Sequence, residues 1–387
     1  MSSNSQRKVC VVVGSRANYS SIKSAMRAIR DHPETELQLV VGASALLDRY
    51  GTAIDVIERD GFEPDERVFM LIEGETPGTM AKSTGLGLLE LPTAFERLQP
   101  DVVITVGDRF ETMATALAAT YMNLPLAHTM GGEVSGNIDE SIRHAVTKFA
   151  HIHFPSSKGA AERIVRMGED PAAVHTVGCP RMDLVAETLA QNGHELSELF
   201  QFGVGGSFDL DRPFLLVSQH PVTTEYGDGE EQIAETLQAV KEIGLPAVVL
   251  WPNADAGSED VARGIRKFRE FEDDSKLHFF KNLPTDDYIR LMAKTACLVG
   301  NSSSAIREGS FIGTPAVNIG TRQEGRERGS NVVDVDHDGG QIVEAIRAQL
   351  EHGPFGPDPI YGDGHAGERI ADILSRAEID IHKRMTY

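Results

Sequence analysis

The chain has 387 residues, 41% of them apolar and 25% charged, and this length is too great for one ordinary core. Its formal net charge of −21 and its lack of any basic run exclude a nucleic-acid backbone or an anionic membrane as the natural partner. The apolar run near the start, 9–13, is too short for a signal segment or a membrane-spanning helix, so we expect a cytoplasmic protein.

In the first half of the chain, short β-branched runs alternate with longer helix-like stretches. Helices are expected, for example, at 21–32 and 110–123. Alternation of this kind is typical of βαβ units and predicts a parallel sheet. The expected strands are 9–14, 37–42, 101–107, 124–129, 151–155 and 174–178.

A polar stretch rich in glycine and aspartate, 191–212, precedes a second series of strands and helices. We therefore predict an α/β protein with two doubly wound, parallel-sheet domains, at 1–185 and 205–365. A C-terminal helix at 366–387 could return to the first domain. Two such sheets facing each other would form a central cleft beyond the carboxyl ends of their strands, where ligands of such sheets bind. The strands expected in the second half are 213–219, 245–252, 276–280, 296–300 and 314–320.

Polar residues follow three strand ends of the first half. The first strand leads into a loop where helix amides and Arg16 could hold a phosphate. Asp108 and Glu133 each stand just past a strand end, and two acids on adjacent strand tips form a candidate acid/base pair. The alternatives are that Asp108 caps the following helix and that Glu133 is a solvated loop residue.

A polar cluster directly after Glu133 carries charged pairs at helical spacing. Asp139 and Arg143 are four residues apart, so they would share one helix face and could pair there. Glu140 and His144 would share the neighbouring face in the same way. One such pair is usually structural, but its position beside the candidate acids makes Asp139 a further candidate.

The cysteines and histidines do not form a recognisable metal motif. Cys10, Cys179 and Cys297 stand beside apolar residues, and we interpret them as buried free thiols. His151 and His153 alternate on an expected strand, but no third ligand stands at a supporting spacing. We therefore expect neither a metal nor a cofactor.

In the second half, the clearest local signal is a strand that meets three serines and then a helix, at 300–308. Ser302 and Ser303, with the amides of a helix N-terminus, suit a pyrophosphate, and Glu308 could accept hydrogen bonds from a ribose diol. The alternative for this segment is a serine helix cap with nothing bound.

Other strand ends of the second half add basic and polar groups. His220 follows a strand and could donate to a phosphate or shuttle a proton. The loop 251–258, which contains Asn253, follows another strand. Three arginines at 322, 326 and 328 supply the local positive field that an anionic ligand would need in so acidic a chain.

These residues, taken together, resemble the hydrolysing UDP-N-acetylglucosamine 2-epimerases of sialic-acid biosynthesis. The resemblance runs from about residue 9 to 364, and the fused kinase of the animal members is absent from this sequence. The matching motifs, in chain order, are GDRFE, GGEVSGNIDESIRHAVTKFAH, QHPVTTE, PNADAGS, GNSSSAIREG, GTPAVNIGTRQEGRERG and IYGDG.

The resemblance implies two Rossmann-like domains in the GT-B arrangement and a reaction that yields UDP and the free 2-epimerised sugar, N-acetylmannosamine. Loss of UDP from C1 acidifies the C2 proton, a carboxylate removes it to give a glycal, and water adds at C1. The implied catalytic residues are Asp108, Glu133, Asp139, His220 and Arg109, with Asp108 and Glu133 as the expected pair. The implied UDP-binding residues are Arg16, Asn253, Ser302, Ser303, Glu308 and Arg322.

One departure concerns the first loop, which usually reads Arg-Ala-Asp/Glu-Tyr in the family and here carries Asn18. The lost carboxylate could mean another sugar, such as the UDP-2,4-diacetamido-trideoxy sugar of legionaminic-acid synthesis. The remaining alternatives are a non-hydrolysing epimerase, a GT-B glycosyltransferase and a catalytically inactive nucleotide-sugar sensor. The resemblance also implies a homodimer or homotetramer.

Overall fold

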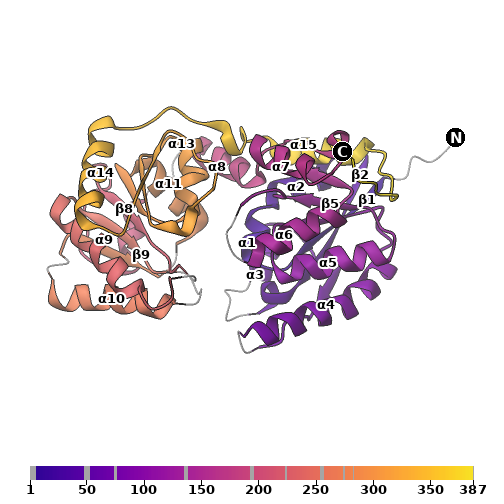
Figure 1. Cartoon of the computed structure of the whole chain (residues 1–387), viewed down its shortest axis with the longest axis horizontal. Coiled ribbons are helices and arrows are strands. Elements are labelled where there is room, and N and C mark those ends of the chain that lie inside the picture. Colours follow the sequence, from indigo (N-terminus) through magenta and orange to yellow (C-terminus); the bar gives the residue numbers. More distant parts are fainter. Residues whose placement is uncertain are drawn as a thin grey trace. The chain divides into compact units, whose positions relative to one another are not determined.

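The computed structural model describes residues 6–47, 53–73, 76–134, 138–191, 196–222, 225–252, 257–272, 275–281 and 283–386. The chain forms two compact units (Figure 1). The first combines Met1–Leu184 with Tyr361–Tyr387, and the second is Val185–Ile360. Residues 186–204, which the sequence left between its two predicted domains, thus belong to the second unit together with Val185, and residues 361–365 belong to the first.

The first unit is built on a six-stranded sheet with the order β3-β2-β1-β4-β5-β6. Every pairing in it is parallel, and the chain order reverses between the neighbours β1 and β4. This reversal is the topological switch point at which doubly wound sheets bind ligands. The strands are β1 (Arg7–Val13), β2 (Thr35–Gly42), β3 (Glu66–Val68), β4 (Val102–Val106), β5 (Leu126–Thr129) and β6 (Ile152–Phe154).

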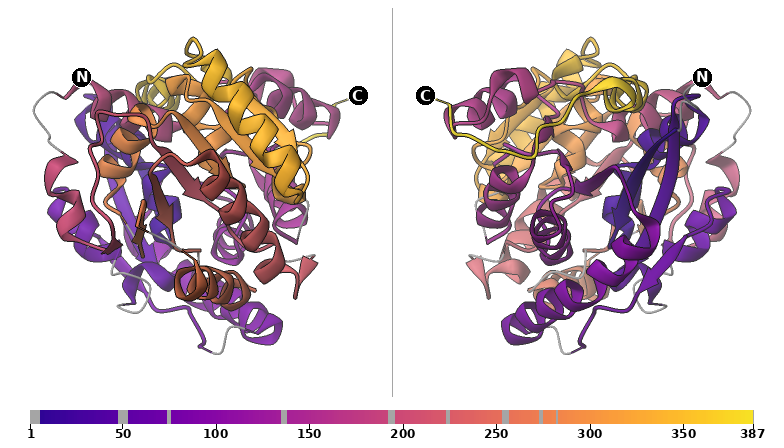
Figure 2. Two further views of the ribbon diagram at one scale, coloured as in Figure 1. Left: turned by 90° about the vertical axis from the view of Figure 1, so that its left-hand side faces the viewer. Right: turned by 90° about the vertical axis from the view of Figure 1, so that its right-hand side faces the viewer.

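Alternating side chains of β1 enter two separate cores, one on each face of the sheet. Val9, Val11 and Val13 pack with α1, α2, α3 and α15, whereas Cys10 and Val12 pack with α4, α5 and α6. The right view of Figure 2 looks onto this unit, with its helices flanking the strands. Its helices are α1 (Arg16–Ser20), α2 (Lys23–Asp31), α3 (Ala53–Arg59), α4 (Pro77–Leu98), α5 (Phe110–Tyr121), α6 (Ile138–Phe149), α7 (Lys158–Arg166), α8 (Pro180–Ala190, which enters the second unit) and α15 (Ala366–Arg376).

The second unit has a seven-stranded sheet with the order β13-β12-β11-β8-β9-β10-β7. Its strands are parallel except for the short edge strand β7, which pairs antiparallel with β10. The chain order reverses between β8 and β11. The strands are β7 (Val204–Gly205), β8 (Leu215–Ser218), β9 (Ala247–Leu250), β10 (Leu277–Phe280), β11 (Cys297–Gly300), β12 (Ala316–Ile319) and β13 (Val332–Val335).

Helices also cover both faces of this second sheet. On one face α9, α10 and α14 enclose a core of aliphatic residues and phenylalanines, and on the other α11 and α12 pack with the short helix Leu196–Gln201. The helices are α9 (Gly229–Ile243), α10 (Ser258–Phe271), α11 (Thr285–Lys294), α12 (Ser303–Ile306), α13 (Glu308–Ile312) and α14 (Gly339–His352). The predicted α/β class with two doubly wound parallel sheets is confirmed.

The strand expected at 174–178 is wrong. Val174 makes an isolated bridge to His153, and no ladder continues from it. The backbone turns away at Gly178, which has a φ of 91° and lies so close to Gly362 that a Cβ atom would approach the Gly362 Cα to 2.7 Å. The apolar pattern therefore marks a buried connection into α8 rather than a seventh strand. The expectation of three buried free cysteines is confirmed.

The C-terminal helix α15 is fixed in the first unit by one buried carboxylate (Figure 1 shows α15 beside α2). Asp183, which is 4% exposed, accepts hydrogen bonds from the backbone amides of Ala366 at 3.0 Å and Gly367 at 2.7 Å. The same carboxylate accepts a bond of 2.8 Å from the hydroxyl of Ser24 in α2. Asp183 thus acts as the N-cap of a helix more than 180 residues away and satisfies amides that the helix itself leaves without partners.

We predict that Asp183→Ala lowers the free energy of unfolding of the first unit by about 2–4 kcal/mol, because three charge-assisted hydrogen bonds are lost. Urea unfolding followed by circular dichroism measures this change. The sole tryptophan, Trp251, lies in the second unit, so its fluorescence follows that unit separately. Asp183→Asn keeps one acceptor and is expected to lose less. Equal stability of Asp183→Ala and the wild type would refute this role.

Candidate functional site

The first cluster of candidate residues lies at the carboxyl ends of β1, β4 and β5. Parallel pairing sets Val11 of β1 beside Ile104 of β4, and Val106 of β4 beside Thr129 of β5. Arg16, Asp108 and Glu133 each follow one of these three strands, so all three lie at the same edge of one sheet. This edge includes the switch point between β1 and β4.

Asn18 ties the first two of these loops together across the switch point. Its side-chain oxygen accepts a 3.2 Å hydrogen bond from the amide of Gly14, and its side-chain NH₂ donates to the Val106 carbonyl at 3.3 Å. Its own amide donates to the Ser15 hydroxyl, the N-cap of α1. Asn18 is 6% exposed, so its amide is occupied within the fold. Arg16, in contrast, is exposed at the first position of α1.

Glu111 is a buried carboxylate that the sequence did not single out, and it lies against Gly14 of this loop. Glu111, in the first turn of α5, is 3% exposed, and its Oε1 pairs with Nε of Arg109 at 3.1 Å. Its other oxygen, Oε2, has no hydrogen-bond partner among the described residues. A Cβ atom on Gly14 would come within 2.2 Å of the Glu111 Cγ, so only glycine fits there. The sequence signal that could have identified Glu111 is its position as the second acid of the GDRFE motif.

Asp108 is paired with an arginine from a neighbouring helix. The buried Arg143 of α6 makes an ion pair with Asp108, which retains 20% side-chain exposure. The sequence had suggested Asp139 as a partner for Arg143, and Asp139 lies half-buried in the first turn of the same helix. The expected pair of Glu140 with His144 is present at 3.4 Å. Helix α6 therefore brings the buried Arg143 to Asp108.

His128 of β5 braces this arrangement from inside the core. Its Nε2 donates to the carbonyl of Gly107 at 2.7 Å, directly before Asp108, and its Nδ1 lies 3.4 Å from the Thr147 hydroxyl of α6. Gly107 itself has a φ of 74°. Burial lowers the pKa of His128 from 6.5 to about 3, so the ring is neutral at physiological pH. The neutral ring links the Asp108 loop with the helix that carries Arg143.

Glu133 is also buried, at 6% exposure, and accepts a hydrogen bond from the Ser156 hydroxyl beyond β6. The chain reaches it through Met130, which has the unusual φ of 61°, and through Gly132, whose φ is 76°. A Cβ on Gly132 would meet the Ala160 carbonyl at 2.3 Å. Left-handed backbone at a non-glycine residue is concentrated at functional sites, and here it orients the turn before Glu133.

The second cluster lies at the switch point of the other unit, between β8 and β11. Asn301, fully buried after β11, accepts a 2.7 Å bond from the His220 amide and donates one of 2.9 Å to the His220 carbonyl. Gly300 allows this close approach, because a Cβ there would lie 2.3 Å from the Ser218 carbonyl. His220 is half-buried at this strand end.

Ser302 and Ser303 follow Asn301 directly. Ser302 is the N-cap of α12, accepts a 3.4 Å bond from the Ser304 amide and lies 2.8 Å from the Ser304 hydroxyl oxygen. Helix α12 has four residues and breaks at Arg307 before α13 begins. A helix this short has little macrodipole, so hydroxyls and individual amides rather than a long helix would serve an anion here.

The arginine-rich segment packs against the same asparagine. Arg322 donates to the Asn301 carbonyl at 3.2 Å, and Gln323 donates to it at 2.9 Å. Glu308 lies at the start of α13 and is 3% exposed. Arg328 is engaged with Asp334 and with the Gln323 carbonyl. The second switch point thus brings together His220, Ser302, Ser303 and Arg322, whereas Asn253 lies outside the described residues.

The histidines that could suggest metal binding have other roles. His151 accepts a 3.1 Å bond from the Leu126 amide, and His153 contacts the buried Glu169 at 3.1 Å. In the described ranges, no group of three or more His, Cys, Asp or Glu side chains could hold a metal ion. Across the same ranges, no helix is long and apolar enough to cross a membrane.

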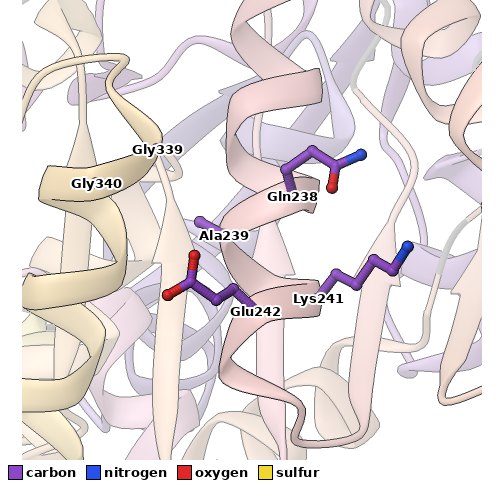
Figure 3. A pocket seen from close by; sticks show the side chains of 6 residues that line it. All are labelled: Gln238, Ala239, Lys241, Glu242, Gly339 and Gly340. Carbon is purple, nitrogen blue, oxygen red and sulfur yellow. The ribbon is translucent and has the colours of Figure 1, made fainter.

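Figure 3 shows a pocket of about 510 Å³ on the outer helices of the second unit, between α9 and α14. None of the candidate site residues lines it, and its Lys241 and Glu242 form ion pairs with Glu272 and Arg347. We give it no functional role. The residues that line it are Gln238, Ala239, Lys241, Glu242, Gly339 and Gly340.

The buried neutral His128 predicts a pH-dependent stability. In the unfolded chain the His128 ring binds a proton below about pH 6.5, whereas in the folded chain it binds one only below about pH 3. Between these two pH values the unfolded state binds more protons, so the free energy of unfolding decreases as the pH falls. The slope expected from this residue is about 1.4 kcal/mol per pH unit. Urea unfolding of the wild type and of His128→Gln between pH 7 and about 5 measures the difference in slope. Parallel pH profiles for the two proteins would contradict the assignment.

Comparison with known proteins gives the family. The family model described as UDP-N-acetylglucosamine 2-epimerase matches residues 27–375. The UDP-N,N'-diacetylbacillosamine 2-epimerase (hydrolyzing) of Legionella pneumophila is 31% identical over 98% of both chains. The UDP-N-acetylglucosamine 2-epimerase of Neisseria meningitidis is 28% identical over 96% of both.

Solved structures show the same fold. The crystal structure of UDP-GlcNAc 2-epimerase from Neisseria meningitidis bound to UDP-GlcNAc superposes with a TM-score of 0.80 at 17% identity, covering 95% of this chain and 99% of that one. The resemblance noted in the motifs is confirmed over nearly the whole length. The chain belongs to the UDP-N-acetylglucosamine 2-epimerase family.

Proposed function

We propose that the protein is a hydrolysing 2-epimerase that converts UDP-N-acetylglucosamine to N-acetylmannosamine and UDP. The observation that carries this proposal is the pair of acids Asp108 and Glu133 on adjacent strand tips of one sheet. Family membership supplies the nucleotide-sugar context. In the proposal, loops of the second unit hold UDP and loops of the first act on the sugar.

The first chemical step is cleavage of the bond between C1 and the pyrophosphate oxygen. Negative charge grows on the departing UDP, and hydrogen-bond donors placed in advance lower the barrier. In the second unit the proposed donors are His220, Ser302 and Ser303, and Arg322 adds positive charge. Arg16 of the first unit is the proposed further cation. Asn253 stays a prediction for UDP binding, as does Glu308 for the ribose.

The second step is removal of the C2 proton. Cleavage gives C1 oxocarbenium character, which acidifies the proton on C2, and a carboxylate takes it to leave a glycal. Water then adds its oxygen to C1, and a proton returns to C2 from the opposite face. Two acid/base groups are therefore needed, and we propose Asp108 and Glu133, with Asp139 and Arg109 beside them. The atoms balance as UDP-sugar plus water giving UDP plus the 2-epimer.

A second candidate substrate follows from one observation. The Legionella relative at 31% identity is named for UDP-N,N'-diacetylbacillosamine and for the hydrolysing reaction. The same elimination and hydration would act on that 2,4-diacetamido-trideoxy sugar, since the chemistry involves C1 and C2 alone. We further propose a cytoplasmic homodimer or homotetramer that serves nonulosonic-acid biosynthesis.

Incubation with UDP-GlcNAc in deuterated water, followed by proton NMR, tests the reaction. We expect UDP and free N-acetylmannosamine with deuterium at C2, because the proton returned to C2 comes from solvent. UDP-sugar product would indicate a non-hydrolysing enzyme, and turnover of the diacetamido sugar alone would indicate the second candidate. UDP binding without turnover of either would leave the sensor hypothesis.

Conservative variants of the two acids test their roles in the same assay. Asp108→Asn and Glu133→Gln are each expected to lower kcat by about 100- to 10,000-fold, the usual contribution of a general acid or base. Glu140→Gln alters a partly exposed acid on α6 and serves as the matched control. Wild-type rates in either acid variant would remove that residue from the mechanism.

Variants of Asn18 test whether this side chain has a structural role or replaces a carboxylate needed for catalysis. In Asn18→Asp, a carboxylate oxygen would face the Val106 carbonyl in place of an NH₂ group, so we expect a loss of about 1–3 kcal/mol of stability and a lower kcat/KM. Asn18→Ala removes the same bonds without adding charge and is expected to be milder. Faster turnover of UDP-GlcNAc by Asn18→Asp would instead show that the carboxylate belongs to the sugar site.

A further inference from the structure

A chain of three hydroxyls, two from buried serines and one from the partly buried Tyr288, ends at Ser302 in the second unit. Tyr288 of α11 hydrogen-bonds through its OH to the Ser304 hydroxyl, and the Ser304 oxygen lies 2.8 Å from the Ser302 oxygen. Ser302 and Ser304 are 8% and 5% exposed. The three side chains come from two segments, α11 and the start of α12 with its N-cap, which packing holds together in the described structure.

The direction of these hydrogen bonds decides what Ser302 can offer to a ligand. A serine hydroxyl has one proton to donate and two lone pairs to accept with. The Ser304 amide already donates to the Ser302 oxygen at 3.4 Å. If Tyr288 donates to Ser304, then Ser304 donates to Ser302, and the Ser302 proton is left to point outward. In the opposite direction, the Ser302 hydroxyl donates its proton to the Ser304 oxygen and has none left for a ligand.

The chemistry of the phenol favours the first direction. Burial raises the pKa of Tyr288 although hydrogen bonds with Ser304, Ser302 and Ser218 act to lower it, so the phenol keeps its proton and can donate it. A phenol is a stronger hydrogen-bond donor than an aliphatic hydroxyl. An anionic ligand next to Ser302 would reinforce the same direction, because hydrogen bonds in a chain polarise one another.

We propose that Tyr288 is a positioning residue that, through Ser304, turns the Ser302 hydroxyl outward as a donor to the pyrophosphate of UDP. This inference rests on the proposed function insofar as it takes Ser302 as a UDP contact. It adds a residue that no strand-end pattern in the sequence had indicated, since Tyr288 lies within a helix. Tyr288 would contribute to UDP affinity without touching UDP.

Isothermal titration of the full chain with UDP alone tests the relay. Tyr288→Phe removes the OH and is expected to weaken UDP binding about three- to tenfold, the value of one neutral hydrogen bond. Ser304→Ala should weaken it similarly. The double variant Tyr288→Phe/Ser302→Ala should bind UDP no more weakly than Ser302→Ala, because the relay acts only through Ser302. Tyr121→Phe, an exposed tyrosine of α5, is the matched control.

The outcomes are distinguishable. A wild type that does not bind UDP would overturn the proposed function. Wild-type binding with unchanged affinity in Tyr288→Phe and Ser304→Ala would overturn the relay alone. Additive losses in the double variant would show that Tyr288 acts on the fold and not on Ser302. The ligand-free melting temperature of each variant, measured in parallel, identifies a variant that fails to fold, and Ser304→Ala then provides the independent test.

Discussion

The candidate site depends on asparagine amides that hold two loops together at each switch point. There, neighbouring parallel strands send the chain to opposite faces of the sheet, so backbone pairing stops just where the functional loops begin. Asn18 spans β1 and β4, and Asn301 spans β11 and β8. An amide side chain can accept and donate at once, so Asn18 satisfies the Gly14 amide and the Val106 carbonyl, and Asn301 satisfies both backbone groups of His220. Each unit thus uses an asparagine amide at its switch point.

Glycine at two positions lets the neighbouring segments come close enough for these short amide side chains to reach their partners. Gly14 lies against Glu111, and Gly300 lies against the Ser218 carbonyl, at distances that exclude any Cβ atom. With the loops drawn together, the acids and donors that follow them are fixed by contacts within the core, such as the His128 bond to the Gly107 carbonyl. The site is therefore positioned by the sheet and its buried polar groups, and its residues have little freedom to rearrange alone.

Much of this could be predicted from the sequence, and the misses have physical causes. Strand ends locate Asp108, Glu133, His220 and Ser302, because apolar runs bounded by polar residues are a local signal. The role of Asn18 could not be predicted, since its partners Gly14 and Val106 become neighbours only when β1 and β4 pair. Other contacts join residues distant in sequence, such as Asp183 with α15 and Tyr288 with Ser304, and no local pattern carries them. The edge strands β3, β7 and β13 were missed because they are short or half-exposed.

The electrostatics explain why uncharged donors matter in this protein. The chain carries a net charge of −21, and several arginines near the candidate site are already paired, Arg143 with Asp108, Arg109 with Glu111 and Arg328 with Asp334. In the proposed function, a dianionic pyrophosphate bound by the second unit would meet the positive charge of Arg322. Oriented hydroxyls and amides would add hydrogen bonds that are short-range and little affected by salt. In such a site the orientation of one donor proton, such as that of Ser302, would affect the binding affinity more than it would in a site with many lysines and arginines.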